Sequence, residues 1–257
     1  MNIREIAKNN SNYYEINREE RNYAAILYAA LCKEQNILQF LALLGFDYEK
    51  TDDFGIYFEY SYLRDLWWCI SDENVKKIII SSNLELAGIN DILSLSNIEI
   101  NKKFGVAGQP STEYVQFPGR WSISKYNSNF SDNEAFLKVC KFKWSFNIKP
   151  DIVIHLNKNR AICIEAKYQS GEGFYPNSEK DKSIFTSRGL KYVGQMELQK
   201  YMMEELLGID TDFVFLVAKK SSSNSHKVVT WSQAFEALDL SAMPLFAQAM
   251  AKNISAA

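Results

Sequence analysis

Histidine is scarce in this chain: the 257 residues include two, and the four cysteines show no Cys-x-x-Cys spacing. Both shortages argue against a zinc site, which takes its ligands mainly from these two residue types. The cysteines are instead expected to be free, buried thiols in a reducing cytoplasm. No apolar run is long enough to span a bilayer, and residues 1–5 lack the apolar core of a signal peptide. We therefore expect a cytoplasmic protein with no membrane partner.

The N-terminal region has the pattern of a helical element. Residues 17–31 combine strong helix formers with a periodic apolar face, and a second apolar stretch, residues 37–44, ends at Gly45. We expect residues 1–50 to form an N-terminal helical extension and residues 51–257 to form one larger domain. The extension could cover the core, form a homodimer or bind a protein partner, and the sequence does not choose among these.

Two short apolar segments in the middle of the chain predict a β-hairpin. Residues 149–156 and 161–167 are rich in β-branched and aliphatic side chains, and a short polar turn separates them. Side chains on a strand alternate between two faces, so Glu165 and Lys167 share one face. Folding the hairpin brings Asp151 level with them. The sequence therefore predicts two carboxylates and an ammonium at one end of an otherwise apolar sheet.

This predicted cluster of charges requires a physical explanation. Two carboxylates a few ångströms apart repel each other, and one of them tends to become protonated. A divalent cation removes that conflict, and hard oxygen ligands favour Mg²⁺, with Mn²⁺ as a substitute. The cation can polarise a phosphoryl oxygen and acidify a bound water, while Lys167 can orient or deprotonate the water or offset negative charge. These properties indicate hydrolysis of a phosphodiester.

The same residues resemble a known signature. Pro150-Asp151, followed after thirteen residues by Glu165-Ala166-Lys167, is similar to the motif of the PD-(D/E)XK nuclease superfamily. The resemblance implies an α/β fold with a restriction-endonuclease-like core, in which helices flank a mixed central sheet. It also implies Mg²⁺-dependent cleavage of nucleic acid. Asp151, Glu165 and the main-chain carbonyl of Ala166 would bind the metal, and Lys167 would assist the attacking water.

The residues after the motif fit this expectation. Residues 191–208 have a helical apolar stripe and end at a glycine, and residues 213–217 read as a buried strand. This order matches the second half of the nuclease core. Several branches of the superfamily carry a Gln near the metal on that helix, so the resemblance implies an auxiliary catalytic role for Gln195.

Many members of the superfamily also contribute a Glu from the helix before the first core strand. Glu59 lies near the start of a predicted helix over residues 58–68, and Glu134 lies at another predicted helix start. Only sixteen residues separate Glu134 from Asp151, which leaves little room for a helix and a full strand. We therefore prefer Glu59 as this catalytic residue and keep Glu134 as the alternative.

Basic residues are concentrated around the motif. The whole chain has a net charge of −2, yet residues 102–191 hold 15 Lys and Arg residues against 8 Asp and Glu. Contact with backbone phosphates is the natural use of such a concentration. The residues expected to contact nucleic acid are Lys141, Lys143, Lys149, Arg188 and Lys191.

The sequence thus predicts a Mg²⁺-dependent endo- or exonuclease that acts on DNA. Roles in restriction, repair or phage defence follow from the resemblance. One alternative is a non-catalytic nucleic-acid-binding or assembly protein that keeps the nuclease fold, although the presence of Asp151, Glu165 and Lys167 together argues against it. The other is an RNase, because a groove that reads the backbone serves DNA and RNA equally.

Overall fold

The chain folds into two compact units, each assembled from separate stretches of sequence. The computed structural model describes residues 17–47, 51–84, 92–106, 113–168, 171–219 and 226–255. The first unit contains Met1–Tyr60, Pro150–Gly171 and Thr211–Ala257. The second contains Ser61–Lys149 and Glu172–Asp210. The expected boundary between residues 50 and 51 does not coincide with this division, because the N-terminal helices belong to the same unit as the central sheet.

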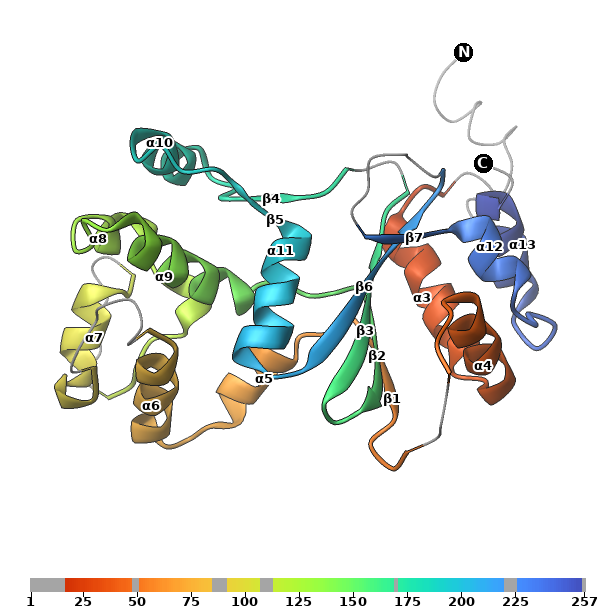
Figure 1. Cartoon of the computed structure of the whole chain (residues 1–257), viewed down its shortest axis with the longest axis horizontal. Coiled ribbons are helices and arrows are strands. Elements are labelled where there is room, and N and C mark those ends of the chain that lie inside the picture. Colours follow the sequence, from red (N-terminus) through yellow and green to blue (C-terminus); the bar gives the residue numbers. More distant parts are fainter. Residues whose placement is uncertain are drawn as a thin grey trace, which may run out of the picture. The chain divides into compact units, whose positions relative to one another are not determined.

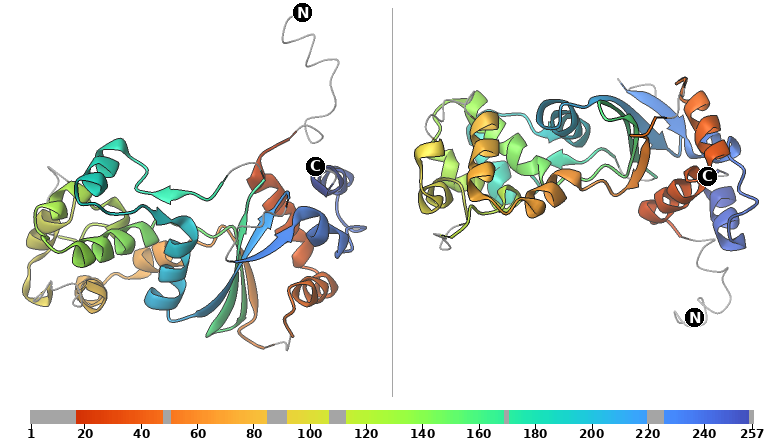
Figure 2. Two further views of the ribbon diagram at one scale, coloured as in Figure 1. Left: turned by 45° about the horizontal axis from the view of Figure 1, so that its top comes forward. Right: turned by 90° about the horizontal axis from the view of Figure 1, so that it is seen from below.

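A five-stranded mixed sheet forms the centre of the first unit (Figures 1 and 2). Its strands, in spatial order, are β1 (Gly55–Phe58), β2 (Ile152–Asn157), β3 (Arg160–Ala166), β6 (Asp210–Val217) and β7 (Lys227–Thr230). The β1–β2 and β2–β3 pairs are antiparallel, and β6 and β7 are parallel. β3 runs in the same direction as β6, because contacts at its two ends follow the same order in both strands. The side chain of Arg160 pairs with Asp212 near the start of β3, and the N–H of Lys167 donates to the carbonyl of Leu216 just after its end.

Four helices cover one face of this sheet: α3 (Glu20–Leu31), α4 (Glu34–Leu43), α12 (Trp231–Glu236) and α13 (Leu245–Ser255) (Figure 1). Their apolar faces and the sheet enclose one core. The hairpin contributes to this core through alternate residues, as period two requires. Those residues are Ile152, Ile154, Ile162, Ile164 and Ala166. The opposite parity places Asp151, Val153, Cys163 and Glu165 on the other face of the hairpin.

The second unit is mainly helical. Its larger helices are α5 (Tyr62–Cys69), α6 (Glu73–Leu84), α7 (Asn97–Lys103), α9 (Asn133–Ser145) and α10 (Glu179–Ser187). Shorter elements are η2 (Ile92–Ser94), η3 (Pro118–Arg120), α8 (Ile123–Asn127), α11 (Gln195–Lys200) and the π-helical turn η4 (Tyr201–Leu206). A two-stranded antiparallel ribbon joins β4 (Phe174–Tyr175) to β5 (Val193–Gly194). Aromatic rings dominate the core of this unit, beginning with the stacked rings of Phe104 and Trp121, 4.7 Å between centroids.

Several predicted elements are confirmed. The helical stripe over residues 191–208 becomes α11 and η4, and Gly208 follows with a left-handed φ of 66°. The predicted strand over residues 213–217 lies within β6, and Asp132 caps α9 beside Glu134. No helix within the described residues combines the length and the apolarity that crossing a bilayer requires.

Two other predictions are wrong. The helix expected over residues 58–68 begins only at Tyr62, because the preceding residues Gly55–Phe58 pair with β2 as an edge strand. A short apolar run of this kind fits either structure, and pairing with a neighbouring strand decides between them. The cysteines are free, as expected, but Cys32 and Cys69 are exposed, and only Cys140 and Cys163 are buried.

Candidate active site

The register of the β2–β3 hairpin brings Asp151 and Glu165 together. Ile152 lies opposite Ile164, so the next positions outward, Asp151 and Glu165, face each other at the open end of the hairpin. Asp151 lies just before β2, and its Oδ2 accepts a hydrogen bond from the main-chain N–H of Ala166, at 2.8 Å. This bond fixes the Asp151 carboxylate against the end of β3. The predicted juxtaposition of the two carboxylates is confirmed.

Lys167 completes the predicted trio. Its Nζ donates to Oε1 of Glu165 at 2.6 Å. Its main chain is held on both sides, because its N–H donates to the carbonyl of Leu216 at 2.7 Å and its carbonyl accepts from Nε1 of Trp231 at 3.1 Å. The main-chain bonds fix the backbone of Lys167, and the bond to Glu165 fixes its ammonium. The structure therefore gives Lys167 a defined position beside Glu165.

A third carboxylate, Glu20, lies beside this trio and was not predicted. Glu20 is the first residue of α3, and its Oε2 accepts a hydrogen bond from the N–H of Tyr168 at 2.6 Å. Its Oε1 lies 3.9 Å from Nζ of Lys167. The contact joins residues 148 positions apart, so no local pattern could have revealed it. Glu20 on α3 thus supplies a helix carboxylate at the cluster.

The electrostatics of the cluster show an excess of negative charge. Burial raises the pKa of Asp151, the neighbouring charge of Glu165 raises it further, and Glu20 adds to the effect. The hydrogen bond from Ala166 and the charge of Lys167 oppose this rise without cancelling it. For Lys167, burial alone would lower the pKa, but the charge and hydrogen bond of Glu165 hold the pKa above its ordinary value. Without a bound cation, the surrounding carboxylates therefore favour the protonated form of Lys167.

These groups fit a hard divalent cation. Asp151 and Glu165 offer oxygen donors, and a cation would offset both the burial and the charge of Glu165 that raise the pKa of Asp151. Within the described residues, no group of three or more His, Cys, Asp or Glu side chains is arranged to hold a metal ion. Two carboxylates with added main-chain and water oxygens suit Mg²⁺, which usually keeps several waters and binds through one or two carboxylates.

Glu59, Glu134 and Gln195 are the remaining predicted site residues, and their catalytic roles stay predictions. Glu59 follows β1 with a φ of 53°, which is incompatible with the helix predicted there, and its side chain pairs with Nε of Arg21 at 2.9 Å. Its main-chain N–H does bond to the carbonyl of Asp151 at 2.8 Å. Glu134 in α9 and Gln195 at the start of α11 belong to the second unit. The auxiliary role of Gln195 stays a prediction.

The predicted nucleic-acid contacts differ in how accessible they are. Lys191 is exposed, and Lys149 is half-buried. Lys141 pairs with Glu197 at 2.6 Å, and burial lowers the pKa of Lys143, whose Nζ bonds to the carbonyl of Gly119.

Arg188 is the most constrained of the five. Its guanidinium bonds to the carbonyls of Asn127 and Phe130 and lies 4.1 Å above the ring of Phe136. Such contacts give Arg188 a structural role in its own unit.

Known proteins do not supplement this picture. Comparison of the chain with protein-family models, with curated proteins and with solved structures finds no match in any of the three. The assignment of function therefore depends on the geometry and chemistry of the site.

Proposed function

We propose that this chain is a metal-dependent nuclease with a restriction-endonuclease-like core, and that it hydrolyses phosphodiester bonds of DNA. One observation carries the proposal: Asp151 and Glu165 face each other across β2 and β3, with the ammonium of Lys167 bonded to Glu165. If the Lys167–Glu165 ion pair served only to stabilise the fold, it would not need Asp151 beside it, because the pKa of Asp151 is raised there by burial and by the charge of Glu165. A site that binds a divalent cation does need it.

Each residue then has a definite task. Asp151 and Glu165 would hold Mg²⁺ or Mn²⁺, together with the main-chain carbonyl of Ala166. The bound cation would supply charge neutralisation and an acidified water. Lys167 would orient or deprotonate that water, or offset the charge that develops on the phosphate. Glu20 would hold the chain after Lys167 in place through its bond to Tyr168.

The basic excess in residues 102–191 supports a nucleic-acid substrate, and the resemblance of the motif favours DNA. A role in restriction, repair or phage defence and a homodimer or protein partner bound through the N-terminal helices stay predictions. So does cytoplasmic location.

The direct test is cleavage by the purified full chain. Supercoiled plasmid, single-stranded DNA and RNA are each incubated with Mg²⁺, with Mn²⁺ and with EDTA. We expect metal-dependent cutting of DNA that Asp151→Asn and Lys167→Ala abolish. Asp212→Asn is the matched control, because Asp212 forms an ion pair on the same sheet with Arg160.

The other outcomes are equally clear. Cutting of RNA alone would replace the proposal with an RNase. Inactivity of wild type on all substrates, combined with tight metal-independent binding in a gel shift, would favour the non-catalytic nucleic-acid-binding protein. Cutting that survives in both Asp151→Asn and Lys167→Ala would remove this site from the reaction.

Metal binding has a readout of its own. At a Mn²⁺ concentration ten times its dissociation constant, a single site stabilises the folded chain by about 1.4 kcal/mol, which raises the melting temperature by a few degrees. We expect this rise in wild type and Asp212→Asn, and not in Asp151→Asn. An equal rise in all three would place the cation elsewhere.

A further inference from the structure

The second unit exposes a group of aromatic side chains next to one another. Trp68, near the end of α5, is 66% exposed, and its ring stacks on Phe117 with 5.6 Å between centroids. Tyr114, in the segment before η3, is 52% exposed. We call Trp68, Tyr114 and the half-buried Phe117 the aromatic platform. A single exposed apolar residue needs no explanation, but a contiguous exposed aromatic group usually marks a binding surface.

Buried polar contacts hold the platform in place. The side chain of Asn101 is fully buried, and it donates to the carbonyl of Tyr114 and accepts from the N–H of Gln116, both at 2.8 Å. Nε1 of Trp121 donates to the carbonyl of Gln116 at 3.1 Å. Phe117 also packs edge-on against the buried ring of Phe146. The segment that carries Tyr114 and Phe117 is therefore fixed before any ligand arrives, which reduces the entropy lost on binding.

Two cations border a hollow beside the platform. The hollow has a volume of about 360 Å³, and Trp67, Lys76 and Arg120 line it together with the platform. Lys76 pairs with Glu73 at 2.7 Å and lies 5.6 Å from the ring of Trp67. Arg120 is exposed, and its guanidinium makes no hydrogen bond or ion pair with any residue that the structure describes. The hollow thus combines open aromatic rings with an uncommitted positive charge.

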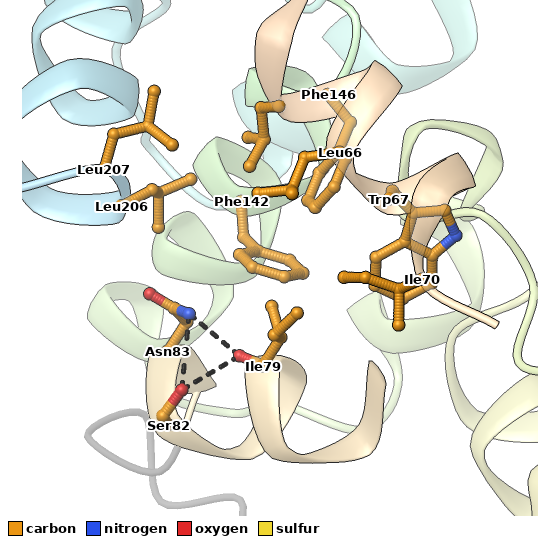
Figure 3. Close-up of a pocket in the computed structure, with 11 residues that line it drawn as sticks. Leu66, Trp67, Ile70, Ile79, Ser82, Asn83, Phe142, Phe146, Leu206 and Leu207 are labelled. Atoms are coloured by element: carbon orange, nitrogen blue, oxygen red, sulfur yellow. Dashed lines mark hydrogen bonds between the residues drawn. The ribbon is translucent and has the colours of Figure 1, made fainter. Parts of the chain in front are cut away.

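A neighbouring pocket in the same unit has a different character (Figure 3). It has a volume of about 250 Å³, and leucine, isoleucine and aromatic side chains make up most of its wall. Its two polar residues, Ser82 and Asn83, both bond to the carbonyl of Ile79, at 3.2 and 2.8 Å. Among the residues that the structure describes, no cation lines that pocket, so it lacks the charge that an anionic ligand would need.

We propose that the hollow beside the aromatic platform binds an unstacked nucleobase of single-stranded DNA, with the adjoining phosphate on Arg120. Stacking on aromatic side chains is sequence-tolerant because every base has a π-face, and a guanidinium pairs well with phosphate. A proline-rich peptide would use the rings but would leave Arg120 without a partner. The inference rests on the proposed nuclease function and adds to it a site that engages unpaired strands.

Binding is measured without cleavage, so the two proposals can fail separately. The full chain carrying Asp151→Asn is titrated in EDTA with a fluorescein-labelled twelve-nucleotide oligo-dT and with a duplex of the same length. Trp68→Ala and Arg120→Gln are added to this background. Phe246→Ala is the matched control, because Phe246 is an exposed aromatic residue in the other unit.

We expect Trp68→Ala to weaken single-strand binding about tenfold and duplex binding little. Arg120→Gln should weaken single-strand binding about threefold and reduce the slope of log affinity against log salt by about one. Phe246→Ala should change neither. Cross-linking of an oligonucleotide containing 5-bromodeoxyuridine should label Trp68 or Tyr114.

Unchanged single-strand binding in Trp68→Ala, an equal loss for duplex, or cross-links confined to other residues would overturn the inference. So would displacement of the oligonucleotide by a proline-rich peptide. If Trp68→Ala weakens single-strand binding but the wild-type chain cleaves no substrate, the binding site stands and the proposed nuclease function fails. If the wild-type chain cleaves DNA but Trp68→Ala leaves single-strand binding unchanged, the nuclease function stands and the binding site fails.

Discussion

The two ends of the β2–β3 hairpin carry ion pairs of the same length in opposite surroundings. Near the turn, Arg160 and Asp212 lie 2.6 Å apart with side chains 43% and 40% exposed. At the open end, Lys167 and Glu165 also lie 2.6 Å apart, but their side chains are 13% and 2% exposed. Distance alone therefore does not distinguish a surface ion pair from a candidate active site.

The difference lies in burial and in the balance of charge. An exposed pair such as Arg160–Asp212 contributes little, since water screens it and two side chains lose freedom. The Lys167–Glu165 pair has further carboxylates at Asp151 and Glu20, so negative charge exceeds positive charge in a buried place. Such an arrangement destabilises the fold unless a cation joins it, which is the behaviour of a functional site.

The largest effect should come from neutralising the buried carboxylate. We expect Glu165→Gln to lower the rate of DNA cleavage at least about 100-fold, because the amide cannot offer a charged oxygen to a cation. Asp212→Asn, at the exposed end, should stay within about twofold of wild type. Cleavage rates at saturating Mg²⁺ measure both. Equal losses in the two variants would show that the ends do not differ in function.

The second effect concerns stability and its dependence on pH. Because the pKa of Asp151 is raised in the folded state, the unfolded chain releases this proton first as pH rises. The contribution of Asp151 to the free energy of unfolding therefore falls from about pH 4, the ordinary range of an Asp pKa, up to the raised pKa, and is lowest above it.

Asp151→Asn removes this dependence and can still accept the hydrogen bond from Ala166. We expect it to raise the free energy of unfolding by about 2 kcal/mol at pH 8 and by almost nothing at pH 4. Urea unfolding of both proteins in EDTA across this range measures the difference. A destabilised Asp151→Asn at pH 8 would contradict the electrostatic account.

Glu20 should have a smaller effect on catalysis. Glu20→Gln keeps an oxygen for the N–H of Tyr168 but removes the charge 3.9 Å from Lys167. We expect cleavage to slow by about tenfold with the melting temperature nearly unchanged. Glu19→Gln is the control, since Glu19 is the exposed neighbouring residue. A loss of stability without a loss of rate would make the role of Glu20 structural.

The smallest effect should come from breaking the exposed ion pair near the turn of the hairpin. We expect Arg160→Gln to change the free energy of unfolding by less than about 0.5 kcal/mol, and the change should vanish in 1 M salt. Paired urea titrations at low and high salt measure it. A change above about 1 kcal/mol that persists in salt would mean that both ends of the hairpin depend on their charges.

The sequence predicts the trio of Asp151, Glu165 and Lys167 because strand alternation and a short turn are local properties. It misses Glu20 because the position of α3 over the sheet depends on packing between distant segments. It assigns Glu59 to a helix because the run after Gly55 is too short for periodicity to separate strand from helix. The charge count around Arg188 is correct, but a count does not say that the guanidinium turns inward over Phe136.

The hairpin also contains one extra residue with a consequence at its far end. Pairs from Ile152 to His155 follow one register, whereas Asn157 pairs with Arg160 one step out of it, so Leu156 is unmatched on β3. Without that bulge, Asp151 would lie opposite Ala166 instead of Glu165. Residues 158 and 159 are exposed, and surface turns usually accept insertions and deletions. The bulge is a different case, because it decides which side chains of β2 and β3 face each other at the open end of the hairpin.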